Sequence, residues 1–141
     1  MRTTTRQFDF VNRLTQIASV NNQPSTINQS TYAYDPANQR TSRTEADNSF
    51  WLYSYDLLGQ ATAAKRYWSD GVPVAGQQFE YIFDWIGNRL STSTGGDEMG
   101  AALRAAAYAA STLNQYTQRT VPSWVSILGE TSSNTTVRAC Q

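Results

Sequence analysis

The amino-acid sequence predicts an all-β chain that folds as one curved antiparallel sheet of consecutive β-hairpins. One short unit supports this: an aromatic residue, then Asp, then Gly or Asn three residues after the Asp. It recurs four times in 141 residues. In three of the four units a second aromatic residue lies two positions before the first, which places both rings on one face of a strand. The aspartates stand 26, 21 and 28 residues apart, the length of two short strands with their connections.

The four units follow one another through the first 90 residues of the chain. They are Phe8–Leu14, Tyr32–Arg40, Tyr53–Gln60 and Tyr81–Leu90. We assign a structural role in the repeat to their aromatic residues, aspartates and turn residues. These are Phe8, Asp9 and Asn12; Tyr32, Tyr34, Asp35 and Asn38; Tyr53, Tyr55, Asp56 and Gly59; and Tyr81, Phe83, Asp84 and Gly87.

The middle of each unit predicts a chain reversal. An Asp carboxylate accepts hydrogen bonds from backbone N–H groups two or three residues further on and so opens a turn. Gly and Asn, three residues after each Asp, tolerate positive φ at the least cost. A type I turn followed by a left-handed residue is a common way to reverse a strand. Pro36 occupies the turn position whose φ proline presets. Each unit therefore predicts a strand, an Asp-initiated turn and a return strand.

The aromatic pairs predict how the hairpins associate. Aromatic residues favour strands, and each cross-strand contact between such residues stabilises a sheet by roughly 0.2–1 kcal/mol. A single hairpin is marginally stable, so neighbouring units must supply the remaining contacts. An alternative that these residues leave open is four unrelated hairpins in an ordinary sandwich or barrel.

The units at Tyr53–Gln60 and Tyr81–Leu90 resemble the YD repeat of bacterial Rhs proteins, teneurins and toxin-complex C components. Phe8–Thr15 is similar to the same motif in its Asn-Arg-Leu-Thr form, and Leu113–Thr117 to a segment that follows such repeats in Rhs-type chains. The resemblance covers roughly residues 6–120. It departs at Arg6, where the outer aromatic residue belongs, and at Asn38, which replaces a glycine.

The resemblance implies a spiral sheet of hairpins that closes, in complete family members, into a hollow shell. Such a shell encloses a toxin or other cargo domain or displays adhesion surfaces, so further YD repeats and a cargo are the implied partners. We expect a repeat section over residues 1–120 and a C-terminal strand or frayed tail over residues 121–141. Complete bacterial shells can cut themselves at Asp-Pro-x-Gly elements, but here Ala37 follows Asp35-Pro36. We expect no self-cleavage and, with only four repeats, a fragment of a larger shell.

Composition narrows the function classes. Lys plus Arg and Asp plus Glu number 11 each, so no net field attracts nucleic acid. Histidine is absent, which removes the commonest general base and metal ligand, and the single Cys140 cannot form an intrachain disulfide. We expect no catalytic, cofactor or metal site.

No run approaches the ~18 apolar residues of a membrane span, and no signal peptide is evident. The compartment stays undecided, although members of the resembled family are often secreted or on the cell surface.

Three further segments have competing interpretations. The Ala-rich residues 97–110 have the propensity of a helix, while the repeat register favours a strand, which we prefer. Residues 65–68 are two cations followed by two aromatics, which could suit stacking on single-stranded nucleic acid. Two cations in a neutral chain make a poor nucleic-acid site, so we interpret these residues as a strand, followed by a hairpin loop at residues 69–73. The tryptophans are expected to pack within the shell. A carbohydrate- or cell-surface-binding module using exposed Trp and Tyr is the alternative function. The tryptophans are Trp51, Trp68, Trp85 and Trp124.

Overall fold

A computed structural model describes residues 3–21 and 26–121, and the regular secondary structure of these residues consists of ten β-strands. The strands are 4 to 11 residues long. Their bounds are β1 (Thr3–Phe8), β2 (Leu14–Val20), β3 (Thr26–Tyr34), β4 (Arg40–Glu45), β5 (Phe50–Tyr55), β6 (Ala61–Tyr67), β7 (Pro73–Phe83), β8 (Arg89–Gly95), β9 (Leu103–Ala110) and β10 (Tyr116–Arg119).

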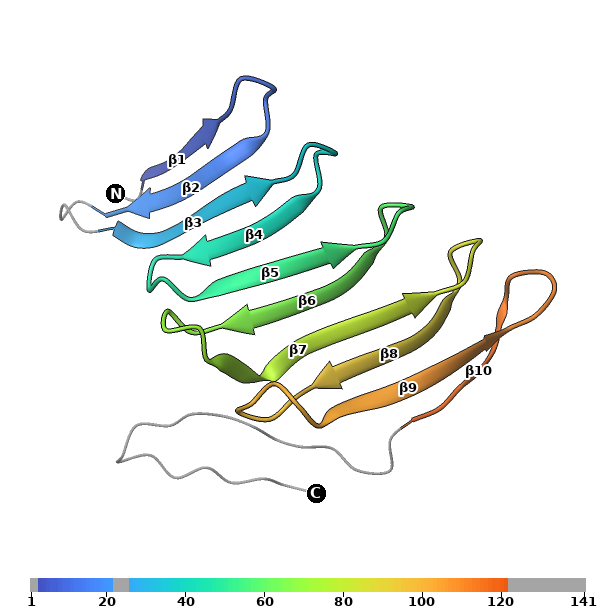
Figure 1. Cartoon of the computed structure of the whole chain (residues 1–141). Helices are drawn as coiled ribbons and strands as arrows, with labels where there is room; N and C mark the ends of the chain where they lie inside the picture. The colour runs from blue at the N-terminus through green and yellow to red at the C-terminus, as the bar shows by residue number, and fades with distance from the viewer. Residues whose placement is uncertain (1–2, 22–25, 122–141) are drawn as a thin grey trace.

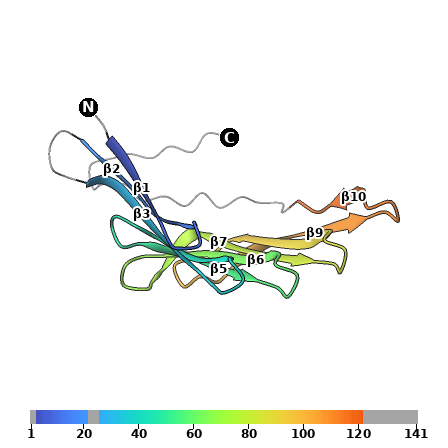
Figure 2. The ribbon, with the colours of Figure 1, turned by 90° about the horizontal axis from the view of Figure 1, so that it is seen from above.

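The ten strands form one antiparallel sheet in which each strand pairs with its neighbour in sequence. Figure 1 shows them stepping from β1 at one edge to β10 at the other, without closure. Figure 2 shows β1 to β3 steeply inclined to the later strands, as expected from the twist that successive strands accumulate. The predicted curved antiparallel sheet is confirmed, and the alternative of an ordinary sandwich or barrel is wrong.

The hairpins that carry the four units contain a β-bulge at the same place. In each, the pairing register shifts at the aromatic residue that precedes Asp. A bulge bends its strand and increases the local twist, so repeated bulges at one end of the sheet contribute to its curvature. The shifts lie between Gln7 and Phe8, Ala33 and Tyr34, Ser54 and Tyr55, and Ile82 and Phe83.

The eight hairpin turns in the described part of the chain have one geometry. The N–H of the fourth residue donates to the carbonyl of the first, and the N–H of the first donates to the carbonyl of the fifth. The fourth residue has positive φ in every case. These fourth residues are Asn12, Asn38, Asn48, Gly59, Gly71, Gly87, Gly100 and Asn114. One turn geometry therefore builds both ends of the described sheet.

Three of these turns were missed by the sequence analysis. They begin at Glu45, Asp97 and Ser111. The available signal was the residue three positions later, Asn48, Gly100 or Asn114. The turn at Ser111 joins β9 to β10 and lies at the same end of the sheet as the four units, so it forms a fifth unit (Figure 1). Here Ser replaces Asp and Ala110 stands in the place of the aromatic residue.

The Ala-rich segment is a strand, as preferred. Leu103–Ala110 is β9, and its acidic start is a turn that begins at Asp97 rather than the first turn of a helix. Five residues of β9 pair with β8, among them Ala106 with Thr92. Small Ala side chains fit a closely paired sheet, and the ladder hydrogen bonds outweigh an intrinsic helix preference of tenths of a kcal/mol per residue.

The sheet is a single layer with very little enclosed core. Among the described residues, only Val74 and Ala106 are buried apolar residues. The other buried positions are mostly small or amide side chains, such as Ser49 and Gln78. Stability must therefore come from the backbone ladders and from contacts along the two faces, because no second layer covers either face in the described part of the chain.

Candidate functional site

One face of the sheet carries the aromatic pairs together with arginines. We call it the aromatic–arginine face. Cross-strand partners share a face, and one such row runs from Tyr32 through Arg43 and Trp51 to Arg66. All eight arginines of the described residues lie on this face. The face comprises Tyr32, Tyr34, Trp51, Tyr53, Tyr55, Phe79, Tyr81, Phe83 and Tyr108 with Arg6, Arg13, Arg40, Arg43, Arg66, Arg89, Arg104 and Arg119.

Charge is thus segregated in a chain whose net charge is zero. On the described residues the carboxylates lie mainly in the turns, whereas the arginines lie on one face. Salt bridges join Arg13 to Asp9 and Arg43 to Glu45 on this face. The opposite face carries the pair Lys65 and Glu80. The aromatic–arginine face is therefore cationic.

In the second unit, arginines stack on the aromatic pair. The Arg40 guanidinium carbon lies 4.4 Å from the centroid of the Tyr32 ring and 5.9 Å from that of Tyr34. Arg13, from the preceding unit, lies 5.0 Å from the Tyr34 ring centroid. Such cation–π contacts stabilise by about 0.5–2 kcal/mol each, depending on exposure. The arginine that follows the turn therefore stacks on both rings of the strand that leads into the turn.

The fourth unit repeats this arrangement with a wider reach. Arg89 lies 5.1 Å from the Tyr81 ring centroid and 5.8 Å from that of Phe83, both on β7. It also lies 5.9 Å from the Tyr108 ring on β9, which in turn receives Arg119 at 5.5 Å. One guanidinium thus links three consecutive strands. Sequence reasoning assigned no role to these arginines, although Arg40 and Arg89 both follow their Asp by five residues.

Tyrosine hydroxyls connect neighbouring units. Tyr34 Oη donates to the carbonyl of Leu14, and Tyr55 Oη donates to the carbonyl of Arg40, both at 2.9 Å. In each case the tyrosine directly before Asp reaches the return strand of the preceding unit. Phe83 has no hydroxyl with which to make the equivalent bond. The choice of Tyr at this position therefore has a specific reason, beyond burial of a ring.

The aspartates hold the turns through their carboxylates. Asp56 Oδ1 accepts from the backbone N–H groups of Leu58 and Gln60, both at 2.9 Å. Asp84 Oδ1 accepts from Ile86 at 3.1 Å and Asn88 at 2.7 Å. The donors stand two and four residues after Asp, which corrects the expectation of two or three. The N–H three residues on is not free, because it already donates to the backbone carbonyl of Asp.

These hydrogen bonds shift the titration of two aspartates. Desolvation raises the pKa of Asp9, but the backbone N–H and guanidinium of Arg13 outweigh it and hold the pKa below its ordinary value of 3.8. Desolvation likewise raises the pKa of Asp84, but the hydrogen bonds from Asn88, Ile86 and Gly87 together outweigh it and hold the pKa below its ordinary value. Both carboxylates are therefore anionic parts of a turn at neutral pH, with their lone pairs already engaged.

Adjacent turns contact one another along this end of the sheet. The fifth residue of each turn reaches the fourth residue of the next. Arg13 Nη1 donates to Asn38 Oδ1 at 3.0 Å, and Asn88 Nδ2 donates to Asn114 Oδ1 at 3.3 Å. Where the fourth residue is glycine, the side-chain amide of a glutamine from the preceding turn lies close to it. A Cβ added to Gly59 would stand 3.1 Å from Gln39 Nε2, and a Cβ added to Gly87 would stand 3.4 Å from Gln60 Nε2. The five turns thus form a connected ladder.

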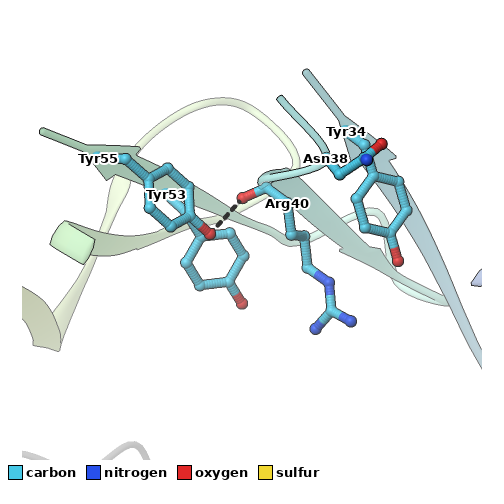
Figure 3. Close-up of a pocket in the computed structure, with 5 residues that line it drawn as sticks. All are labelled: Tyr34, Asn38, Arg40, Tyr53 and Tyr55. Atoms are coloured by element: carbon cyan, nitrogen blue, oxygen red, sulfur yellow. Dashed lines mark hydrogen bonds between the residues drawn. The ribbon is translucent and has the colours of Figure 1, made fainter. Parts of the chain in front are cut away.

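A shallow depression of about 350 Å³ lies between the second and third units. Tyr34, Asn38, Arg40, Tyr53 and Tyr55 line it, and Figure 3 shows the Tyr34, Arg40 and Tyr53 side chains directed to the same side of the ribbon. Burial raises the pKa of Tyr53. Its phenol is therefore a neutral hydrogen-bonding group at physiological pH.

The residues of the four predicted units lie in two places, the turns and one face of the sheet. The aspartates and their Gly or Asn partners, Asn12, Asn38, Gly59 and Gly87, lie in the turn ladder. The paired rings, from Tyr32 to Phe83, lie on the aromatic–arginine face, whereas Phe8 is 53% exposed on the edge strand β1.

The tryptophans divide between different surroundings. Trp51 is half-buried, and its ring stacks against Tyr53 and Phe79 with centroids 6.4 and 6.2 Å apart. Trp68 is also half-buried, beside Arg66. Trp85 lies at a turn tip and is 86% exposed, so the described part of this chain does not provide the packing that was expected for it within the shell. Trp124 and Cys140 lie outside the described residues, as does nearly all of the expected tail 121–141.

Residues 3–21 and 26–121 contain no group of three or more His, Cys, Asp or Glu side chains placed to hold a metal ion. The same part of the chain contains no helix long and apolar enough to cross a membrane.

Comparison with known proteins identifies the type of fold. No protein-family model matches the chain, and no curated protein matches its sequence. Among solved structures, a chain in the crystal structure of TcdB2-TccC3-Cdc42 superposes with a TM-score of 0.68 at 16% sequence identity. The match covers 82% of this chain and 6% of that chain. A match at this identity shows the fold alone: the chain has an Rhs/YD-repeat-like fold, as the resemblance implied.

Proposed function

We propose that this chain is a non-catalytic structural section of an Rhs/YD-type shell that encapsulates a cargo or displays a surface. The observation that carries the proposal is the repeated unit. Five hairpins present the same turn at the same end of one unclosed, curved sheet. A wall needs such regularity, because each hairpin must present the same edges and contacts to the next.

The single-layer architecture supports the same role. Almost no apolar side chain of the described residues is enclosed, and the rings are held instead by arginines, by hydroxyl bonds and by the neighbouring unit. A sheet stabilised along its own faces does not require a second layer over either face. One face can then line an enclosed volume while the other faces outward.

The partners that we propose follow from the free edges and the faces. Within the described residues, β1 pairs only with β2 and β10 only with β9, so each edge strand presents a row of backbone groups to a further strand. We propose further YD repeats as partners at these edges. We also propose an enclosed toxin or other cargo domain as the partner of one face.

Electron cryomicroscopy of the native protein that contains this sequence tests the proposal. We expect the segment to form part of the wall of a hollow particle, with β1 and β10 both continued by additional strands. A solid domain in which helices or loops cover both edges would refute the shell role. A specific turnover abolished by Asp56→Asn, with the fold retained, would refute the non-catalytic part.

Binding of a carbohydrate is a second candidate, favoured by the depression beside Tyr53. Three phenols, an amide and a guanidinium around about 350 Å³ suit the hydroxyl groups and apolar ring face of a sugar. A glycan array would test this with the wild-type chain and Tyr53→Ala, and Tyr67→Ala on the opposite face would be the matched control. Hits lost only in Tyr53→Ala would support it, and absence of hits from the wild type would remove it.

A further inference from the structure

The tips of the five unit turns form an exposed apolar row. The second and third residues of these turns, which a type I turn normally fills with polar residues, are Phe10 and Val11, Pro36 and Ala37, Leu57 and Leu58, Trp85 and Ile86, and Thr112 and Leu113. We call this row the apolar rim. None of the ten residues is charged. Leu57 is fully exposed, and Phe10 and Trp85 are 96% and 86% exposed.

The opposite end of the sheet has a different composition. There the corresponding tip positions of the three described turns hold Ala46 and Asp47, Ser69 and Asp70, and Glu98 and Met99. Each tip carries a carboxylate. The same turn geometry therefore presents an apolar row at one end and an acidic row at the other. Turn chemistry alone does not explain the apolar residues, because both ends satisfy it.

Hydrogen bonds between neighbouring turns hold the apolar rim in place. The ladder from Arg13 to Asn38, and from Asn88 to Asn114, ties neighbouring turns together. Neighbouring turns are two strands apart, so the tips recur about every 9–10 Å and the row extends about 40 Å. The rim is therefore a preformed surface, and ordering it on contact costs little.

The size of the apolar rim suits a protein interface. An exposed aromatic side chain offers about 150–250 Å², and the rim contains two aromatics and five large aliphatic residues. Its apolar area exceeds the roughly 300–600 Å² of the largest patch on a typical monomer. It approaches the roughly 800 Å² that each partner contributes to a standard interface.

We propose that the apolar rim binds the apolar rim of a second copy of this chain, in an antiparallel arrangement with two-fold symmetry. This surface is separate from the aromatic–arginine face and from the sheet edges, so the inference goes beyond the shell role. The two-fold axis passes near the central turn, where Leu57 and Leu58 meet the same residues of the second copy. The large Trp85 and Ile86 then face the small Pro36 and Ala37, and Phe10 faces Leu113.

Two other occupants fit less well. The acidic tips of the opposite end would place Asp47 and Asp70 against leucines. This would desolvate two carboxylates that accept hydrogen bonds only from their own turns, and a leucine side chain offers no donor to replace the lost water. A lipid surface would meet Asp9, Asp35, Asp56 and Asp84 directly behind the tips. These carboxylates give the rim no cationic surplus toward anionic lipid. A second apolar row matches the rim in length and in apolar character, and it places the one small tip, Pro36 and Ala37, against the large Trp85 and Ile86.

Sedimentation velocity over a range of concentrations tests the inference. The rim variant Leu57→Ser/Leu58→Ser/Trp85→Ser/Ile86→Ser should weaken dimerisation of the 141-residue chain more than about 100-fold, because each large apolar side chain buried at an interface contributes about tenfold or more. The matched control is Val72→Ser/Met99→Ser at the acidic end, which should dimerise like the wild type. Unchanged far-UV circular dichroism will show that all variants fold.

Cross-linking gives the orientation. In a Cys140→Ser background, Leu57→Cys should form a disulfide-linked dimer under mild oxidation, and Ser69→Cys at the acidic end should not. A dimer that persists in the rim variant, a wild type that stays monomeric, or equal cross-linking at both ends would overturn the inference. So would a monomeric wild type that floats with phosphatidylcholine vesicles, because the rim would then be a lipid-binding surface.

Discussion

In each of the eight described turns, the backbone N–H of the fifth residue donates to a side-chain oxygen within the turn. In five turns the acceptor is an Asp at the first position, as in Asp97 bonding Ala101, and in one it is Ser111. The turns beginning at Glu45 and Trp68 use an Asp at the third position, Asp47 or Asp70. A left-handed fourth residue completes each turn. Two local requirements, an oxygen acceptor and a residue tolerant of positive φ, thus account for every described reversal.

Gly87 tests the second requirement. Its φ is +93°, where a β-branched side chain is strained, and a Cβ would lie 3.4 Å from the Gln60 amide. We expect Gly87→Val to lower the free energy of unfolding by roughly 1–3 kcal/mol. The matched variant Gly87→Asn should cost less, since Asn occupies this position in other turns, such as at Asn38. Thermal unfolding followed by circular dichroism measures both, and equal melting of Val and wild type would show that the turn does not limit stability.

Asp9 and Asp84 predict a loss of stability in acid. The folded state holds the pKa of both groups below the ordinary value of 3.8, so the folded state binds fewer protons than the unfolded state. Their contribution is complete above that value and is lost as pH falls through the lowered folded pKa. In urea unfolding at a series of pH values, Asp9→Asn/Asp84→Asn should show a shallower fall below pH 3.8 than the wild type. Parallel curves for the two proteins would contradict this.

At the scale of elements, the arginines link hairpins that the backbone already pairs. The Nε groups of Arg40, Arg43, Arg66 and Arg89 are buried and make no hydrogen bond. Ring stacking therefore accounts for much of how Arg40 and Arg89 are held. The strand pairs also differ in side-chain support: β7 and β8 share six register pairs and the Arg89 contacts, whereas β4 and β5 share three register pairs. Local stability should vary along the sheet accordingly.

Arg89→Ala should destabilise the chain by about 1–3 kcal/mol, since it removes contacts to rings on β7 and β9. Arg89→Lys is the matched variant, because it keeps the charge but loses the planar guanidinium. We expect Lys to recover less than half of the loss. Hydrogen exchange should show faster exchange in β8 and β9 for the Ala variant. Full recovery by Lys would mean that charge, and not ring stacking, is what matters.

At the scale of the whole molecule, the open sheet and the zero net charge act together. Each edge strand offers unpaired backbone groups to another chain, and a neutral protein has little repulsion to oppose association. Edge pairing has no closure in an open sheet, so it adds copies indefinitely. Rim pairing, by contrast, ends at a dimer. The two kinds of association are therefore separable by the size of the product.

Charges on the first edge should limit the larger species. We expect Thr3→Lys/Thr5→Lys on β1 to reduce oligomers beyond the dimer, because like charges on an edge oppose its pairing. The control Ala46→Lys/Ser69→Lys adds the same charge at turn tips away from the edge. Light scattering after size-exclusion chromatography compares the three proteins. An equal reduction in both variants would assign the effect to net charge, and no reduction in either would argue against edge pairing.

The residues alone determined the strand-and-turn character of this chain. Asp followed by a residue that tolerates positive φ is a local signal, and rings two apart define a face without reference to the rest of the fold. The four units therefore predicted a curved hairpin sheet, and three more turns carried the same fourth-residue signal unnoticed. The Ala-rich residues 103–110 show the limit of local reasoning, because propensity favoured a helix and pairing with β8 produced a strand.

Only the tertiary structure decided which side chains meet across strands. The gathering of all described arginines on one face depends on register, and each bulge changes which residues lie opposite one another. The contact between Arg89 and Tyr108 joins residues 19 positions apart, and the apolar rim joins tips spread over about 100 residues of sequence. Such contacts arise from the pairing of distant strands, whose positions a local motif does not specify.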